Sequence, residues 1–243
     1  MIVIKGATMI RNFVYDVQQE FARKLVEQEF VTDKGGAKTI EIINASFIAD
    51  EKSIFGEVNE DYVKRELEWY RSLSLNVNDI PGGPPAIWKQ VADKDGLINS
   101  NYGWCIYSEE NGHQFTKVVN ELVSSPLSRR ATMIYIRPTM HEDYKRNGMS
   151  DFMCTYSTQY YIRDGKLLAS VFMRSNDAVY GYKNDYAWQR YVQEQLLQAI
   201  NGRCNTVYAL GDICWNAGSL HVYERHFDLV NNWAIADGDF IVR

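Results

Sequence analysis

The chain lacks the cysteine, histidine and glycine patterns that mark several common protein classes. Its four cysteines, Cys105, Cys154, Cys204 and Cys214, include no pair at CxxC spacing, so neither a disulfide framework nor a zinc knuckle is expected. Neither GxGxxG nor GxxxxGK[ST] occurs, so dinucleotide and P-loop chemistry are not indicated. His221 and His226 do not have the i, i+4 spacing of a helical ligand pair, and we expect no metal site.

Long apolar runs and an excess of positive charge are also missing. No apolar run approaches membrane-spanning length, and the first five residues are too short for a secretory signal, so we expect a cytoplasmic protein without a membrane partner. A net charge of -5 and a pI of about 5.5 argue against general nucleic-acid binding. The 243 residues, 46% of them hydrophobic, suffice for one large domain spanning residues 1–243.

Apolar periodicity predicts a mixture of helices and strands. Helices are expected over roughly 11–29, 60–72, 115–122, 185–200 and 219–230, and strands over 39–48, 131–137, 154–163, 166–174 and 205–215. The Asp164-Gly165 pair predicts a tight hairpin between two of these strands, because both residues tolerate positive φ. Since strands and helices do not alternate strictly, the pattern favours an α+β fold over a doubly wound sheet.

The polar stretch at positions 174–185 is the most informative part of the sequence. It crowds an arginine, a serine, two aspartates, two asparagines and a glycine into twelve positions after an apolar run. This pattern predicts a polar loop that leads into a helix and binds a small charged ligand. Asp185, at its end, has two interpretations from the residues alone: a carboxyl that contacts the ligand, or the N-cap of the following helix.

Cys154 is the candidate nucleophile, because a thiolate is stabilised where cations lie nearby. The candidate cations are Arg129, Arg130 and Arg174, and paired arginines also suit phosphate. The residues alone leave other interpretations open. Cys154 is also typical of a buried small hydrophobe, and Arg129 with Arg130 of a solvated surface pair.

Two further positions carry groups suited to acid–base or binding roles. Glu66 and Glu68 lie two apart on a predicted helix, so at most one of them faces a site, and either suits a surface position. His221 follows a predicted strand, where a histidine also serves as a helix cap or a packed core group.

Taken in order, several segments resemble the thymidylate synthase family, and within it the phage deoxycytidylate (dCMP) 5-hydroxymethylases. The resemblance covers about residues 30–230 and rests on the segments 65–70, 87–88, 99–104, 128–130, 148–155, 174–185 and 218–223. It implies an α+β fold with a large mixed sheet flanked by helices, and an obligate homodimer formed through the sheet. It also implies a phage source, dCMP as substrate and 5,10-methylenetetrahydrofolate as co-substrate.

The resemblance assigns a role to each matched residue. Cys154 is expected to add to C6 of the pyrimidine, with Glu66 as the principal acid–base group and Tyr102 assisting proton removal at C5. The residues expected to bind the nucleotide are Lys34, Arg174, Ser175, His221 and Tyr223, with Arg129 and Arg130 reaching the phosphate in the partner subunit's site. The residues expected to bind the folate are Trp88, Asp177 and Gly181.

Two departures from thymidylate synthases favour the hydroxymethylases, and the first of them shifts the expected base from uracil to cytosine. The synthases usually have Asn where this chain has Asp185, and a carboxyl group suits the N3/N4 edge of cytosine, because it can accept from N4-H and donate to N3. Asp185 is therefore expected to act both in substrate binding and in catalysis. Thr155 also stands where the synthases have a histidine after the cysteine, a feature shared with the hydroxymethylases.

The expected reaction is transfer of the folate one-carbon unit to C5 of dCMP, followed by addition of water to give 5-hydroxymethyl-dCMP. A methyltransferase on the same scaffold, making 5-methyl-dCMP or dTMP with release of dihydrofolate, is the alternative. A nucleotide-binding or nucleic-acid-binding regulator without catalytic activity is a third hypothesis. The segment 238–243 does not align with the apolar tail that synthases close over folate.

Overall fold

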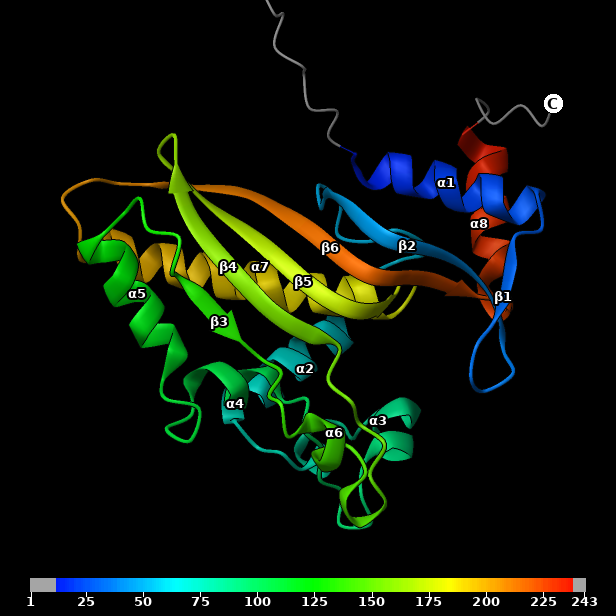
Figure 1. Ribbon diagram of the computed structural model, residues 1–243, viewed down its shortest axis with the longest axis horizontal. Coiled ribbons are helices and arrows are strands. Elements are labelled where there is room, and N and C mark those ends of the chain that lie inside the picture. Colours follow the sequence, from blue (N-terminus) through cyan, green and yellow to red (C-terminus); the bar gives the residue numbers. More distant parts are fainter. Residues whose placement is uncertain (1–11, 238–243) are drawn as a thin grey trace, which may run out of the picture.

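The computed structural model describes residues 12–237 and shows one large sheet flanked by helices (Figure 1). The C-terminal segment 238–243, which is not expected to match the apolar tail of the synthases, lies outside the described residues. The strand order is β1-β2-β6-β5-β4-β3, and neighbouring strands run antiparallel except β5 and β6, which are parallel. The predicted α+β class is confirmed. The strands are β1 (Phe30–Thr32), β2 (Lys38–Ile48), β3 (Thr132–Ile134), β4 (Thr155–Arg163), β5 (Lys166–Asp177) and β6 (Ala209–Tyr223).

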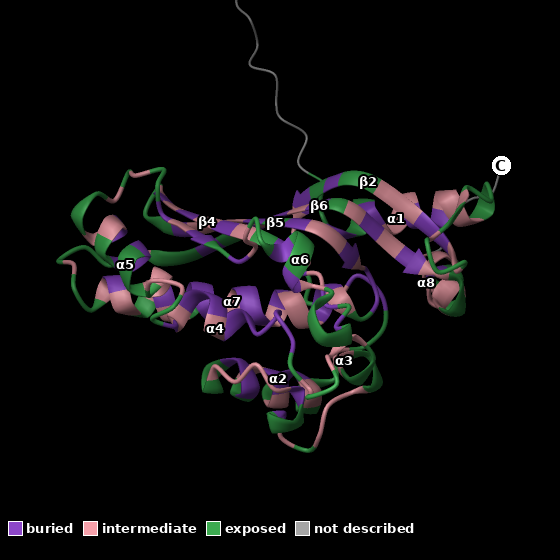
Figure 2. Cartoon of the chain, turned by 60° about the horizontal axis from the view of Figure 1, so that its bottom comes forward, coloured by how far each residue is buried: buried purple, intermediate pink, exposed green. Residues whose placement is uncertain are grey.

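The helices lie mainly on one side of the sheet. Figure 2 shows α7, α4 and α2 below β4, β5 and β6, whose opposite side carries no helix in this view. No helix within residues 12–237 is long and apolar enough to cross a membrane. The α-helices are α1 (Val14–Val26), α2 (Glu60–Ser72), α3 (Ala86–Val91), α4 (Tyr102–Tyr107), α5 (Gln114–Ser124), α6 (Met140–Asp143), α7 (Gly181–Asn201) and α8 (Phe227–Asp237), and the short 3-10 helices are η1 (Val77–Asp79), η2 (Arg146–Gly148) and η3 (Glu224–His226).

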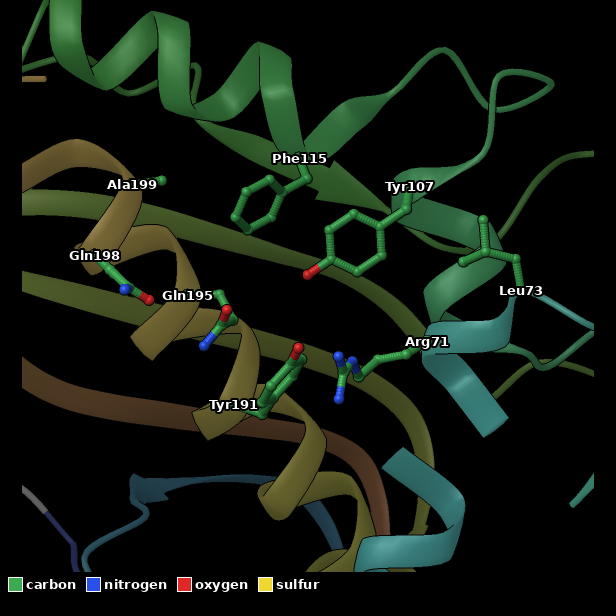
Figure 3. Close-up of a pocket in the computed structure, with 8 residues that line it drawn as sticks. All are labelled: Arg71, Leu73, Tyr107, Phe115, Tyr191, Gln195, Gln198 and Ala199. Carbon is green, nitrogen blue, oxygen red and sulfur yellow. The ribbon is translucent and has the colours of Figure 1, made fainter. Parts of the chain in front are cut away.

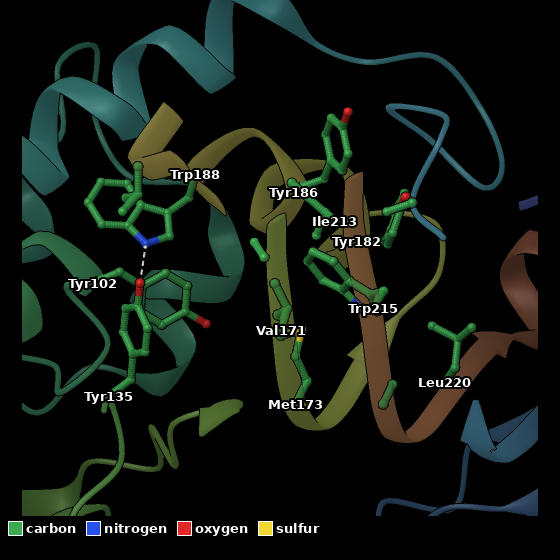
Figure 4. Packing of buried hydrophobic residues seen from close by; sticks show 14 of the residues in the cluster. Tyr102, Tyr135, Val171, Met173, Tyr182, Tyr186, Trp188, Ile213, Trp215 and Leu220 are labelled. Atoms are coloured by element: carbon green, nitrogen blue, oxygen red, sulfur yellow. Dashed lines mark hydrogen bonds between the residues drawn. The ribbon is translucent and has the colours of Figure 1, made fainter. Parts of the chain in front are cut away.

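The core between α7 and the sheet is built largely from aromatic rings (Figure 4). Trp188 on α7 and Trp215 on β6 are fully buried. The indole of Trp188 donates a hydrogen bond to the hydroxyl of Tyr135 at 3.2 Å, and its ring meets Tyr70 edge-on at 5.0 Å. Large rings bury much apolar area each, and edge-to-face pairs add specific geometry. The packing therefore fixes α7 on the sheet.

The sheet changes its side-chain alternation at one level across several strands. In β6, alternate residues are buried up to Ala217, but the next buried residue is Leu220, three positions further on. The positions whose side chains are buried therefore shift by one residue. In β4 the register shifts between Thr155 and Ser157, and in β2 Asn44 has a φ of 55°. Such irregularities bend strands and redirect side chains. Cys154 and Arg174, as well as the polar end of β6, lie at or beyond this level.

The helix predicted over 219–230 was wrong. Strand β6 continues to Tyr223, and the helix that follows is α8, after one turn of 3-10 helix. In this segment Leu220 and Val222 are fully buried while His221 is only partly buried, which is the period of two expected of a strand. Pairing of β6 with both β2 and β5 outweighs the local helical pattern.

The polar stretch 174–185 is also organised differently from the predicted loop. Its first four residues continue β5, a short turn follows, and α7 already begins at Gly181 with Tyr180 as its N-cap. Asp185 therefore lies inside the helix, which rules out the N-cap interpretation. The hairpin predicted at Asp164-Gly165 is confirmed, since both residues have positive φ, 49° and 73°.

Gly103 sets the closest approach between α2 and α4. A Cβ added at Gly103 would stand 1.8 Å from the carbonyl oxygen of Tyr70, a backbone atom that cannot rotate away. We expect Gly103→Ala to destabilise the fold by roughly 3 kcal/mol or more, or to prevent folding, because overpacking forces backbone shifts. Urea denaturation measures this. Gly202→Ala, where the nearest atom would lie at 3.4 Å and φ is -70°, is the matched control and should change stability by less than about 1 kcal/mol. Equal stability of the two variants would contradict the close approach.

Candidate active site

Cys154 lies directly before β4, beside the guanidinium of Arg174. The distance from Arg174 Nη2 to Cys154 Sγ is 3.5 Å. Arg174 is held there by donating from Nε to the carbonyl of Met153 at 3.0 Å and from Nη2 to that of Phe152 at 2.6 Å. Burial raises the pKa of the Cys154 thiol to about 11, although Arg174 lowers it. The sulfur is therefore a thiol before substrate binds, with one cation in place to stabilise the thiolate as it forms.

Asp185 projects from the second turn of α7 into the same site. Asn176 donates from Nδ2 to Asp185 Oδ2 at 2.8 Å. The pKa of Asp185 is raised to about 8, mainly by burial and also by the negative charge of Glu66, against hydrogen bonding from Tyr102 and Asn176, which lowers it. The carboxyl is therefore largely protonated at neutral pH and can donate as well as accept.

Gly181 leaves room for this pair. A Cβ at Gly181 would stand 3.2 Å from Asn176 Nδ2 and 3.7 Å from Asp185 Oδ2. The first distance is tighter than ordinary contact, so a larger side chain would push against the amide. The structure thus places Gly181 against the group that holds Asp185. Its predicted folate contact stays a prediction.

Glu66 is the second acid of the site, and it is 5% exposed on α2, whereas Glu68 points to solvent. The prediction that only one of the two faces inward is confirmed. Tyr62 donates from its hydroxyl to Glu66 Oε1 at 2.6 Å, and Trp88 Nε1 donates to the same oxygen at 3.2 Å and to the Tyr62 hydroxyl at 2.9 Å. Burial raises the pKa of Glu66 to about 7, against these two donors. A carboxyl with a near-neutral pKa suits proton transfer.

Tyr102 is buried at the start of α4, between the acids and the aromatic core. Its ring stacks on Tyr70 at 5.3 Å and meets Tyr135 edge-on at the same distance. Burial raises its pKa, and the charges of Asp185 and Cys154 raise it further. The phenol therefore stays protonated and is positioned next to both of these groups.

The parallel pairing of β5 and β6 places the predicted site residues of these two strands side by side. Ser175 pairs with Ser219, and Asp177 pairs with His221. The Nδ1 of His221 lies 3.3 Å from the Ser219 hydroxyl, and its ring meets that of Tyr223 edge-on at 5.1 Å. Burial lowers the pKa of His221, so the imidazole is neutral at pH 7 and can both donate and accept. This row suits a ligand hydroxyl.

Three predicted phosphate ligands are exposed, and none of them hydrogen-bonds to Cys154 within residues 12–237. Lys34 is exposed in the turn between β1 and β2. Arg129 and Arg130 are exposed before β3, and Arg130 pairs with Glu121 at 3.0 Å. Strand β3 pairs with β4 so that Thr132 lies opposite Gln159, five residues after Cys154. Arg129 and Arg130, which precede Thr132, therefore lie at the far end of β4 from the Cys154 sulfur. Of the three candidate arginines, Arg174 is the one that meets Cys154.

Three residues at the site were missed from the sequence. Tyr62 holds Glu66, and its position one helical turn earlier was a usable signal. Asn176 holds Asp185, but its role depends on the strand that replaces the predicted loop. Asp151 accepts from the backbone amides of Asn99 and Ser100 at 2.7 and 2.8 Å, which joins the loop before α4 to the loop before Cys154.

Protonation of Asp185 predicts how stability depends on pH. Because its folded-state pKa, about 8, lies above the ordinary value of 3.8, folding favours the protonated form. The stability that depends on that proton is fully present below pH 3.8 and is lost as pH rises through 8. Glu66 acts in the same direction up to about pH 7.

We therefore expect Asp185→Asn to reduce the loss of unfolding free energy between about pH 5 and pH 9 by roughly 2 to 5 kcal/mol, measured by urea denaturation. Asp164→Asn, on the exposed hairpin, should leave the slope unchanged. An unchanged slope in Asp185→Asn would show that the carboxyl is ionised in the folded protein.

Comparison with known proteins agrees with this geometry. The family model described as thymidylate synthase matches residues 29–235. The deoxycytidylate 5-hydroxymethyltransferases of Enterobacteria phages T4 and T2 are each 56% identical over 221 residues, covering 90% of this chain and 90% of each relative. Thymidylate synthase of Bacillus atrophaeus is 32% identical over 171 residues, covering 68% of this chain and 70% of the relative.

Among solved structures, the thermostable thymidylate synthase A from Bacillus subtilis has the same fold. The TM-score is 0.63 at 24% identity, and the match covers 88% of this chain and 83% of that chain. The sheet order, the paired acids and the cysteine beside an arginine are thus found in a chain whose sequence matches the family model over most of its length. The chain belongs to the thymidylate synthase family.

Proposed function

We propose that this protein is a dCMP 5-hydroxymethylase, a one-carbon transferase. The observation that carries the proposal is the half-buried Asp185 carboxyl, which is held by Asn176 and largely protonated at neutral pH. Its support from the comparisons is the 56% identity to phage proteins named deoxycytidylate 5-hydroxymethyltransferase.

Base recognition follows from the donor and acceptor pattern of cytosine. Cytosine donates from N4 and accepts at N3, so it needs one acceptor and one donor from the protein. A protonated Asp185 offers both, and the amide of Asn176 keeps the carboxyl in one orientation. Uracil, which accepts at O4 and donates from N3, would leave these buried groups mismatched, and that costs free energy.

Activation of the ring uses the same groups. As the Cys154 sulfur forms a bond to C6, Arg174 stabilises the developing thiolate, and the thiol proton passes to Asp185 as that carboxyl gives its own proton to N3. The C5–C6 double bond opens and electron density moves toward N3, which takes the proton of Asp185. C5 is then nucleophilic. The high pKa of the free thiol implies that bound substrate, rather than the empty site, promotes ionisation.

The residues around Trp88 and Asp177 fit a flat folate ring. Asp177 Oδ1 already accepts from the amides of Val179 at 2.7 Å and Tyr180 at 3.2 Å, while Oδ2 lies 3.9 Å from Arg225. The carboxylate is partly exposed, so Oδ2 can accept from a ring N–H. Trp88 offers a half-buried indole next to Glu66. Bound 5,10-methylenetetrahydrofolate would supply the one-carbon unit to C5.

Glu66 is proposed to control the water step. A carboxyl with a pKa of about 7 can accept a proton from water and return it within one cycle. Tyr62 and Trp88 hold one of its oxygens, which leaves the other for water. Once the C5 proton and tetrahydrofolate have left, addition of that water to the exocyclic methylene on the nucleotide passes a water proton to Glu66 and expels the Cys154 sulfur from C6. The C5–C6 double bond is restored and C5 carries the hydroxymethyl group. Tyr102, beside Asp185, is proposed to assist removal of the C5 proton.

The nucleotide phosphate and sugar are proposed to lie along the polar ends of β5 and β6. Arg174 and Ser175 would take the phosphate, with Lys34 from the β1–β2 turn. The neutral His221 and Tyr223 would bond the deoxyribose hydroxyl. These groups share one end of the sheet, since Tyr223 pairs with Thr39, close to that turn.

We further propose that two chains pair through the uncovered side of the sheet. Two exposed apolar side chains, Tyr156 (42%) and Phe172 (38%), line a hollow of about 270 Å³ there. An exposed apolar face of this kind is typical of an interface. Arg129 and Arg130, which lie far from the Cys154 of their own chain, would then complete the phosphate site of the partner.

The origin of the product oxygen tests this function. Incubation with dCMP, 5,10-methylenetetrahydrofolate and oxygen-18 water should give 5-hydroxymethyl-dCMP with labelled hydroxyl, detected by mass spectrometry. Cys154→Ser should abolish turnover, and Cys214→Ser, at a half-buried cysteine on β6, is the control that should retain it.

Asp185→Asn should shift the ratio of kcat/KM for dCMP over dUMP toward dUMP by about 10²-fold. A methyl product with release of dihydrofolate would favour the alternative methyltransferase. Binding of dCMP without any turnover would favour the regulator.

A further inference from the structure

A second hollow, of about 420 Å³, lies between the ends of α2, α4 and α7 and the start of α5 (Figure 3). Its walls are aromatic: Tyr107 and Phe115 lie 5.1 Å apart between ring centroids on one side, and Tyr191 lies on the other. Burial raises the pKa of Tyr107, and the effects of Tyr191 and Arg71 on it show that all three are close. The volume is in the range of small-molecule sites.

The polar groups of this hollow have no partners among residues 12–237. Arg71 is exposed and forms no ion pair with any of them, and the amides of Gln195 and Gln198 hydrogen-bond to no side chain or backbone group there. A guanidinium next to aromatic faces suits an anion attached to a flat ring, since it pairs with phosphate and the rings stack. Two adjacent amides can complement a heterocycle edge.

Three of the four helices that line the hollow, α2, α4 and α7, also carry a group of the active site. Arg71 follows Glu66 on α2, and Tyr107 follows Tyr102 on α4, by five residues in each case. On α7, Gln195 follows Asp185 by about 15 Å along the axis. The two sites therefore share three rigid elements.

Trp188 lies between the two sites. Its ring is 6.4 Å from Tyr107 and 5.9 Å from Tyr191 in the hollow, and 5.0 Å from Tyr70 and 6.4 Å from Tyr102 on the active-site side. A ligand that moves the tyrosines of the hollow thus acts directly on a fully buried ring that supports the catalytic tyrosine. Packed cores transmit such shifts because they contain few voids.

We propose that this hollow is a second nucleotide site, which takes a nucleoside phosphate with its phosphate on Arg71 and its base against Tyr107, Phe115 and Tyr191. Occupancy changes the rate of the active site through Trp188. The proposal that the hollow binds a nucleotide rests on the hollow alone. The proposal that occupancy changes the rate of turnover rests on the proposed dCMP chemistry.

The test uses the full-length protein with its active site saturated by dCMP and dATP as the probe in isothermal titration calorimetry. We expect saturable dATP binding that Arg71→Gln and Tyr191→Leu each weaken by at least about tenfold. Lys64→Gln, an exposed cation on the same helix, is the control and should leave it unchanged. Unchanged dCMP affinity in each variant verifies that the fold is intact. Inorganic triphosphate and deoxyadenosine, added separately, should bind more weakly than dATP.

Added dATP should also change dCMP turnover by about twofold or more, and Arg71→Gln should remove that effect. No binding of dATP at millimolar concentration, or binding that competes with dCMP, would overturn the proposal, as would affinity that survives both variants. Binding without any change in turnover would overturn the coupling. If dCMP is not turned over at all, the proposed function fails while the calorimetric result still decides the site.

Discussion

The partial burial of the Asp185 carboxyl is the constraint on which the proposed chemistry depends. An aspartate side chain that is largely shielded from water retains its proton to neutral pH, and Asn176 at 2.8 Å fixes its orientation. The nearby Glu66 acts in the same sense, because two carboxyls that share a site do not readily ionise together. The site thus keeps one acid for the cytosine edge and another, with a pKa of about 7, for water.

The fold positions these groups by placing each on a different rigid element. Helix α7 carries Asp185, α2 carries Glu66, and the β4–β5 hairpin brings Cys154 and Arg174 together. The shift in side-chain parity across the sheet turns the polar ends of β5 and β6 toward the same site. The aromatic core around Trp188 then holds α7, α2 and α4 in fixed positions relative to one another. No single segment contains the site, which explains why local patterns describe it incompletely.

Much of this arrangement could be predicted from the sequence, but its helix and strand boundaries could not. The inward orientation of only one of the two helical glutamates, the Asp164-Gly165 hairpin and the α+β class all follow from local periodicity and turn chemistry. The extension of β6 through His221 does not, because pairing with β2 and β5 decides it. For the same reason the support of Asp185 by Asn176 was missed: it requires strand β5 to reach past Arg174 and α7 to begin at Gly181.

The most direct test of this account is the protonation state of Asp185 itself. Carbon-13 NMR of the aspartate carboxyl groups, with Asp185→Asn to assign the resonance, measures its titration in the free protein. We expect a midpoint near pH 8. A midpoint near the ordinary value of 3.8 would contradict it, because an ionised carboxylate could not donate to N3 of cytosine.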